Sequence, residues 1–162
     1  MQDNNNKEVK TEDFEIVATK RTEINKEQLF KLLAKHEELI LTIDRVGKVI
    51  KSKYPDKKGV YPYGCFIDYV VDVEEPEENV TEYEIGIYYN LGVPTMEQKF
   101  NLTSGFYIFK ILETVVDLSN AEEIAVTEDF ISNTLKGVSF IATLGTSKHG
   151  FYIKPVELLG IE

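Results

Sequence analysis

The sequence predicts a mainly β protein with helices, of the α+β class, in which an antiparallel sheet forms a single domain. Short stretches of alternating apolar and polar residues recur along the chain, and turn-rich segments separate them. One stretch, between the third and fourth of the longer strands, instead carries a wide apolar stripe at helical spacing. The prediction rests on this order of elements.

Composition limits the class of protein. The chain has 162 residues, 43 % of them hydrophobic, which suits one compact domain with its own core. Its apolar runs are far shorter than the ~18 residues of a membrane span, and its polar N-terminus lacks the apolar centre of a signal peptide. Cys65 is the single cysteine, so neither an internal disulfide nor a zinc cluster of cysteines is expected. We expect a cytoplasmic protein of a host cell's interior, with a flexible arm over 1–23 and one domain over 24–162.

A helix is predicted over 26–37. Asn25 is a preferred N-cap residue, and Gln28 follows it at the spacing of a capping box. Before this helix, residues 1–10 have the composition of a disordered segment, and residues 12–20 fit a short strand or an arm.

Three strands are predicted over 39–51, 64–73 and 82–91. Gly47, near the middle of the first strand, predicts a bulge or a strong bend. Cys65 shares one face of the second strand with large apolar residues, so we expect a buried core residue there and not a reactive thiol.

A shorter strand over 96–102 and a helix over 105–117 are expected next, with Thr103 or Ser104 as the helix cap. The apolar face of this helix is wide, which indicates burial against a sheet.

The last part of the chain begins with an acidic linker over 118–126 and a short helical turn from Thr127. Strands over 138–144 and 151–158, joined by a polar hairpin loop over 145–150, close the domain. The chain order is then strand, strand, strand, helix, strand, strand. This is the order of the OB-fold, a small Greek-key barrel that binds oligonucleotides with its central strands and loops.

Charge is unevenly distributed along the chain. The formal net charge is −10, and residues 72–84 and 112–135 carry carboxylates without any Lys or Arg. The loop expected between the first two strands is instead rich in cations and tyrosines, with Asp56 as its single acid. Because salt screens charges over ~8–10 Å, such a loop can bind phosphates on a chain that is acidic as a whole.

Single-stranded nucleic-acid binding requires cations for the phosphates and aromatic faces for the bases, and this region supplies both. The expected phosphate ligands are Arg45, Lys48, Lys51, Lys53, Lys57 and Lys58. The expected stacking residues are Tyr54, Tyr61 and Tyr63 in the loop, and the outward-facing Phe66 and Tyr88. Lys148 and His149 in the last hairpin are expected to reach the same side of the molecule.

Several segments of the second half resemble a phage-encoded family of small OB-fold proteins that bind single-stranded DNA or are close to such proteins. The similar segments are Lys99–Leu102, Phe106–Val116, Leu135–Ala142 and Gly150–Ile153. Over about 39–158 the order of elements is similar too, and the resemblance implies binding of single-stranded DNA. Bacterial proteins of this class typically end in a long acidic tail. Here the last segment, 155–162, is short and mostly apolar, so recruitment of partners through such a tail is not expected.

Two other functional classes were compared with this one. A non-enzymatic interaction or assembly module of a phage would use the acidic segments as partner surfaces, or the apolar edge at 96–102 to form a homodimer. Burial of Met96 and Phe100 within the domain is equally compatible with the sequence. An enzyme is the least supported class, because the chain has no Gly-rich phosphate loop or EF-hand spacing, and its two histidines, His36 and His149, lie on a helix and in a hairpin.

The sequence therefore predicts a non-enzymatic, non-sequence-specific single-stranded DNA-binding protein that supports replication or recombination. No cofactor, metal or catalytic residue is expected. Its expected partners are single-stranded DNA or RNA, a second copy of the chain, and replication or recombination proteins.

Overall fold

The structure, a computed structural model, describes residues 21–73 and 82–161. Within these residues, strands predominate and three helices accompany them, so the mainly β class is confirmed. In chain order the elements are β1 (Arg21–Glu23), α1 (Lys26–His36), β2 (Leu39–Val46), β3 (Ile50–Lys51), β4 (Tyr63–Asp72), β5 (Glu82–Gly92), β6 (Phe100–Thr103), α2 (Tyr107–Val115), β7 (Glu123–Val126), α3 (Glu128–Leu135), β8 (Val138–Ser147) and β9 (Gly150–Ile161). The predictions for 1–20 and for the acidic turn at 74–78 lie outside the described residues.

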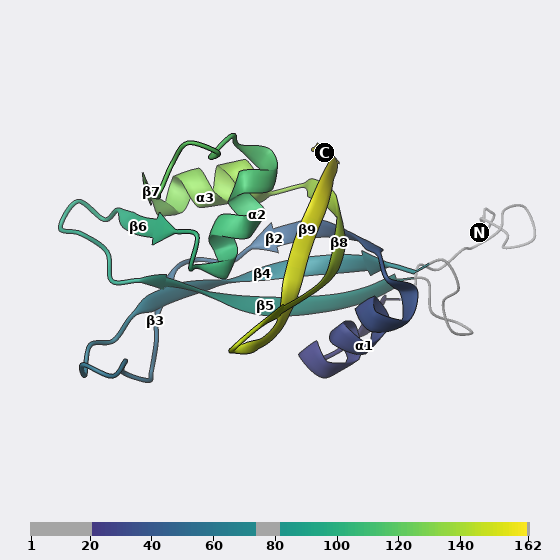
Figure 1. The fold of residues 1–162 in the computed structure, drawn as a ribbon. Coiled ribbons are helices and arrows are strands. Elements are labelled where there is room, and N and C mark those ends of the chain that lie inside the picture. The colour runs from purple at the N-terminus through teal and green to yellow at the C-terminus, as the bar shows by residue number, and fades with distance from the viewer. Residues whose placement is uncertain (1–20, 74–81, 162) are drawn as a thin grey trace, which may run out of the picture.

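One large sheet organises the molecule. Its strands lie in the order β1-β5-β4-β2-β8-β9, with β3 paired to β4, while β6 and β7 form a separate small sheet. Neighbouring strands are antiparallel except β1, which pairs with β5 in parallel. The sheet is therefore mixed and not purely antiparallel as expected. In Figure 1, β4 and β5 run across the view, and β9 crosses steeply in front of them.

The sheet does not close into a barrel. In the described part of the chain, β5 and β9 are not paired with each other. Helix α2 contacts both of these strands, and helix α1 contacts β8 and β5. The two helices thus flank the β8–β9 hairpin on its two sides (Figure 1). The expectation of a closed barrel is not met, because helices cover the core along this seam.

The helix ends show which capping predictions hold. Asn25 accepts a hydrogen bond from the Gln28 backbone N–H while the Gln28 side chain accepts from the Asn25 backbone N–H, so the predicted capping box is present, each bond being 2.9 Å. Thr127 caps α3 through the Phe130 N–H. The cap predicted for the second helix is wrong, because α2 begins after Phe106 without any side-chain cap.

The predicted first strand is divided in two. β2 ends at Val46, and its bulge lies between Ile43 and Arg45 instead of at Gly47. Gly47 turns the chain out of the sheet while its N–H donates to the Phe66 carbonyl at 2.8 Å. The bend that glycine predicts is present, but it begins a projecting segment instead of a bulge.

The region after β5 differs most from the prediction. Only Phe100 to Leu102 of the expected strand are in β6, and Met96 lies fully exposed in the preceding turn. The acidic linker contains β7, which pairs with β6 and leaves Phe100 3 % exposed. Burial of Phe100 is thus the outcome, and this edge of β6 is covered by the chain itself. β9 also continues to Ile161, beyond the predicted end at 158.

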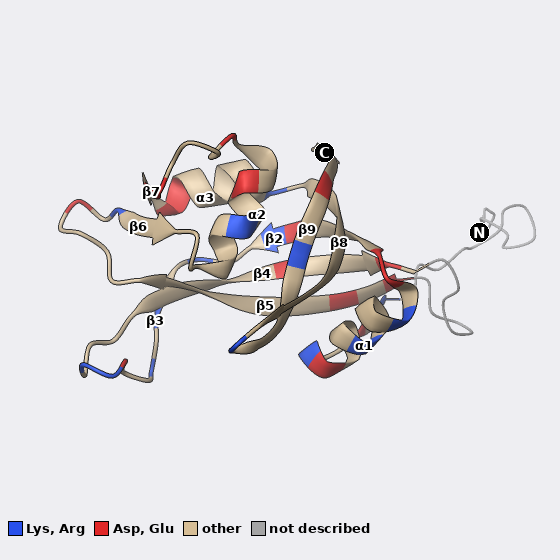
Figure 2. Cartoon of the chain, in the orientation of Figure 1, with Lys and Arg blue, Asp and Glu red and all other residues tan. Residues whose placement is uncertain are grey.

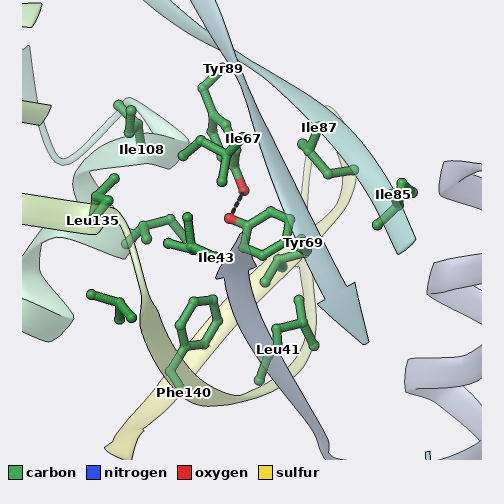
Figure 3. Close-up of a cluster of buried hydrophobic side chains, with 14 of the residues drawn as sticks. Leu41, Ile43, Ile67, Tyr69, Ile85, Ile87, Tyr89, Ile108, Leu135 and Phe140 are labelled. Atoms are coloured by element: carbon green, nitrogen blue, oxygen red, sulfur yellow. Dashed lines mark hydrogen bonds between the residues drawn. The ribbon is translucent and has the colours of Figure 1, made fainter. Parts of the chain in front are cut away.

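The core lies between the inner face of the large sheet and the elements that cross it. Inward-facing residues of β2, β4 and β5 meet α2, α3 and β8 there (Figure 3). Cys65 is 1 % exposed, as its place in the alternation predicts, and burial raises the pKa of its thiol to about 11. No helix in 21–73 or 82–161 is long and apolar enough to cross a membrane.

Two buried tyrosines supply a polar contact within this apolar core. The hydroxyl groups of Tyr69 on β4 and Tyr89 on β5 are hydrogen-bonded to each other at 2.6 Å (Figure 3). Burial is the main cause that raises the pKa of both phenols, so both are neutral around pH 7. Each hydroxyl depends on the other, because an unpartnered hydroxyl in an apolar core is costly.

We therefore expect Tyr69→Phe to lower the free energy of unfolding by about 1–3 kcal/mol, since it leaves the Tyr89 hydroxyl buried without its partner. Tyr69→Phe/Tyr89→Phe removes both hydroxyls and should cost less than the sum of the two single substitutions. Urea denaturation of the four proteins measures this double-mutant cycle. Strictly additive losses would show that the two hydroxyls are not coupled.

Candidate nucleic-acid interface

Residues 47–62 form a projecting segment between β2 and β4, which we call the basic arm. Its base is part of the sheet, because Ile50 pairs with Gly64 and Lys51 with Tyr63. Further out, the Ser52 N–H donates to the Pro62 carbonyl at 2.8 Å. The arm is therefore a hairpin-like extension of the sheet, and it extends away from the body of the molecule around the β3 label in Figure 1.

Asp56 folds the tip of the basic arm. Its Oδ1 accepts hydrogen bonds from the Lys58 N–H at 2.8 Å and from the Val60 N–H at 2.9 Å. Its own N–H donates to the Val60 carbonyl at 2.7 Å. The single carboxylate of the loop is thus engaged with the backbone, as is typical of Asp in turns.

The lysines of the basic arm are exposed and available for phosphates. Lys48, Lys51, Lys53, Lys57 and Lys58 all lie at the surface. Among the described residues, none of them forms an ion pair. The Lys51 ammonium lies 5.8 Å from the centre of the Tyr61 ring. Figure 2 shows this run of cations on the arm, interrupted by one acid.

The three predicted tyrosines of the arm have different surroundings. Tyr54 is 79 % exposed and Tyr61 is 42 % exposed, so both present ring faces to solvent. Tyr63 is half-buried and packs against Phe100, with ring centres 6.4 Å apart. The arm therefore offers Tyr54 and Tyr61 for stacking, while Tyr63 contributes to the body of the fold.

An aromatic pair lies on the outer face of the sheet beside the arm. Phe66 on β4 and Tyr88 on β5 are cross-strand partners whose rings meet edge to face at 5.3 Å, and they are 44 % and 37 % exposed. The Tyr88 ring lies over Gly64, where an added Cβ would come within 2.3 Å of it. Ile50, which pairs with Gly64, is exposed on the same face and extends this apolar surface toward the arm.

Arginines on the outer face already have partners. The Arg45 guanidinium lies 3.2 Å from the Asp68 carboxylate, and Arg21 lies within 4 Å of Asp44, Glu82 and Glu84. The charge of Arg45 is therefore partly neutralised by Asp68, in contrast to the charges of the arm lysines.

A shallow hollow of about 330 Å³ lies where the base of the arm meets α3. Its lining includes Glu97, Glu128 and Asp129. Glu128 accepts a hydrogen bond from the Val49 N–H at 2.6 Å and so fixes the base of the arm to α3. These carboxylates disfavour an anion in the hollow.

The second predicted group, Lys148 and His149, occupies the exposed turn between β8 and β9. This turn and the basic arm both extend toward the lower side of the view in Figure 1. No described group of three or more His, Cys, Asp or Glu residues is placed to hold a metal ion.

Two members of this region were not identified from the sequence. Ile50 joins the outer apolar surface only because the arm pairs in register with β4, and register is not readable from the loop's composition. Lys110 on α2 lies beside Tyr152 on β9, and the distance between them in sequence hides the contact. No local sequence pattern signals either residue, because each is defined by its contact with a distant part of the chain.

Comparison of the chain with protein-family models, with curated proteins and with solved structures found no match in any of the three.

Asp56 provides a direct test of how the arm is ordered. Asp56→Ala removes the acceptor of two N–H groups, so amide exchange at Lys58 and Val60 should accelerate by about five-fold for each hydrogen bond worth about 1 kcal/mol. Asp56→Asn keeps an Oδ1 acceptor and should retain the protection. Hydrogen exchange followed by NMR measures both variants. Unchanged exchange in Asp56→Ala would show that the tip does not depend on this side chain.

Proposed function

We propose that this fold is an OB-fold whose last seam is open. The strand order β5-β4-β2-β8-β9 supports the proposal. In this order β2, β4 and β5 form a meander, and the β8–β9 hairpin pairs with β2 through β8. In an OB-fold the outer face of the second and third strands and two of the loops bind oligonucleotides. Here that face belongs to β4 and β5, and the two loops correspond to the basic arm and the β8–β9 turn.

We propose that the protein is a non-enzymatic single-stranded DNA-binding protein of phage type that acts in replication or recombination in the host cytoplasm. The observation that carries this proposal is the basic arm. It exposes five lysines without ion-pair partners in the described structure, together with two accessible tyrosines, beside an exposed aromatic pair on the sheet. Cations for phosphates next to ring faces for bases are what sequence-independent single-strand binding requires.

The aromatic residues favour a single strand over a duplex. Rings such as Tyr54 and Phe66 gain stacking energy only from bases whose faces are free, and a duplex covers those faces with neighbouring base pairs. Phosphate contacts and stacking on ring faces do not distinguish the bases, so we expect little sequence preference.

The first experiment is fluorescence anisotropy of a labelled oligo-dT titrated with the protein. If all five lysines of the arm neutralise phosphates, log K should fall against log salt with a slope of about −3.5. Affinity should then drop about 100-fold between about 50 and 200 mM salt. Unlabelled single-stranded DNA should compete, and duplex DNA should not.

Charge reversal assigns the site. Lys51, Lys53, Lys57 and Lys58 replaced by Glu should abolish binding without unfolding the domain, because all four are exposed. In a matched control, Glu replaces Lys26, Lys31, Lys35 and Lys136, so the net charge is the same. These four lysines are exposed on α1 and after α3. Equal loss in both variants would mean that overall charge matters and the arm does not.

The tyrosines separate stacking from folding. Tyr54→Ala should weaken oligo-dT binding by about 5- to 150-fold, the range expected for one lost stacking contact, with no change in salt slope. Tyr63→Ala should instead lower the midpoint of urea unfolding, because Tyr63 packs against Phe100. If Tyr54→Ala lowered the unfolding midpoint and left oligo-dT binding unchanged, Tyr54 would be excluded from the interface.

A second candidate function is a protein–protein assembly module. The observation in its favour is the exposed aliphatic surface at the end of the edge strand β9, formed by Val156, Leu158, Leu159 and Ile161. Absence of oligo-dT binding at micromolar protein in about 50 mM salt would favour this candidate over the first.

A further inference from the structure

The turn between β8 and β9 is held to helix α2 by hydrogen bonds around Ser147. The Ser147 hydroxyl donates to the Gly150 carbonyl at 3.3 Å, and its oxygen accepts from the His149 N–H at 3.2 Å. The Tyr107 hydroxyl on α2 lies 2.7 Å from the same oxygen. Because Ser147 has a single hydroxyl hydrogen, Tyr107 is the donor in this contact.

Aromatic packing joins the same elements a second time. The Tyr152 ring on β9 stacks on the Tyr107 ring at 4.9 Å with an interplanar angle of 23°. Across the hairpin, Tyr152 faces Gly145, where an added Cβ would lie 2.4 Å from the ring. The turn, β9 and α2 therefore form one rigid unit.

This unit carries a second group of basic side chains, which we call the hairpin patch: Lys110, Lys148, His149 and Lys154. The Lys110 ammonium lies 5.6 Å from the centre of the Tyr152 ring. Lys154 follows Tyr152 by two residues on β9 and so projects from the same face of the strand. Carboxylates begin further along, at Glu113 on α2 and Glu157 on β9.

The cations of the hairpin patch are not neutralised by close neighbours. Over residues 21–73 and 82–161, the three lysines of the patch form no ion pair. Lys148, His149 and Lys154 are exposed, and Lys110 is partly exposed beside the stacked tyrosines. On a chain of net charge −10, the patch is therefore a second local basic surface separate from the arm.

We propose that the hairpin patch is a second phosphate-binding surface, which takes up the stretch of a single-stranded nucleic acid that continues beyond the basic arm. This inference rests on the function proposed above and extends its site from the outer face of β4 and β5 to α2 and β9. Both surfaces lie near the start of α2, because Phe106 is beside Gly92, which pairs with Tyr63 at the base of the arm. The β8–β9 turn and the arm also both extend toward the lower side of the view in Figure 1.

A flexible polyanion fits these two surfaces better than a folded acidic partner. A single strand is narrow and carries a phosphate at each nucleotide, so it can contact separate basic surfaces on an otherwise acidic chain. A folded acidic protein would bring a broad negative surface against a chain whose net charge is −10, and repulsion would oppose its approach.

The test compares two lengths of oligo-dT, about 8 and about 30 nucleotides, because one OB-fold covers ~4–16 nucleotides. A longer strand offers more positions at which the protein can bind, which alone raises the apparent affinity. The native protein should bind the longer strand more tightly than this statistical gain accounts for. Lys110→Glu/Lys154→Glu, which leaves Lys148 of the turn in place, should bind the short strand as the native protein does, and lose the extra affinity for the long one. With the long strand its salt slope should be less negative by about 1.4, since two contacts are removed at about 0.7 each.

The matched control is Lys26→Glu/Lys35→Glu, which has the same net charge and should keep both the length effect and the slope. Circular dichroism verifies folding, and Lys110→Gln/Lys154→Gln provides a milder variant that should also lose the length effect. If the patch variants keep the native slope on the long strand, the patch does not bind nucleic acid and the inference is overturned, while the arm stands. If the native protein binds neither strand, the proposed function itself fails.

Discussion

The alternation of side chains along β4 is the constraint on which the rest of the structure depends. Cys65, Ile67, Tyr69 and Val71 point inward and are buried, so the register of β4 against both neighbouring strands is fixed by the core. A shift of one residue would bury Phe66 with its polar neighbours and expose the apolar set. Fixing the inner face therefore also fixes the outer face, and places the Phe66 ring beside the base of the basic arm.

Helices complete the core that the sheet leaves open. A sheet with this strand order could close if β9 met β5, but α2 contacts both strands where that pairing would form. The helix is suited to this position because Ile108, Phe109, Ile111 and Leu112 are all buried, so its apolar surface is wider than a stripe facing one layer. The same helix turns Tyr107 toward the β8–β9 hairpin, which links closure of the core to the position of a surface turn.

Local patterns identified the elements that depend on local interactions. The capping box at Asn25 and the buried face of Cys65 follow from spacing alone, and both are present. Features that depend on distant partners were not predictable. The strand β7 has only four residues within an acidic segment, and it forms because it pairs with β6. Tyr63 is withdrawn from the arm because it packs against Phe100. For the candidate site, the sequence located the basic arm, whereas the hairpin patch joins residues of α2 and β9 that only the fold brings together.

The outer face of β4 and β5 explains how an acidic chain can present a basic interface. From the arm outward, the cross-strand pairs are Phe66 with Tyr88, Asp68 with Gly86, and Val70 with Glu84. The surface thus changes from aromatic to acidic over three pairs, a distance of about 13 Å at the usual rise per residue. This exceeds the screening length of ~8 Å at physiological salt, so carboxylates at the far end act weakly on the arm. Arg45 and Arg21 neutralise part of that far end through their ion pairs. On this face the end next to the arm is therefore the part least opposed to an anion, although the chain as a whole is acidic.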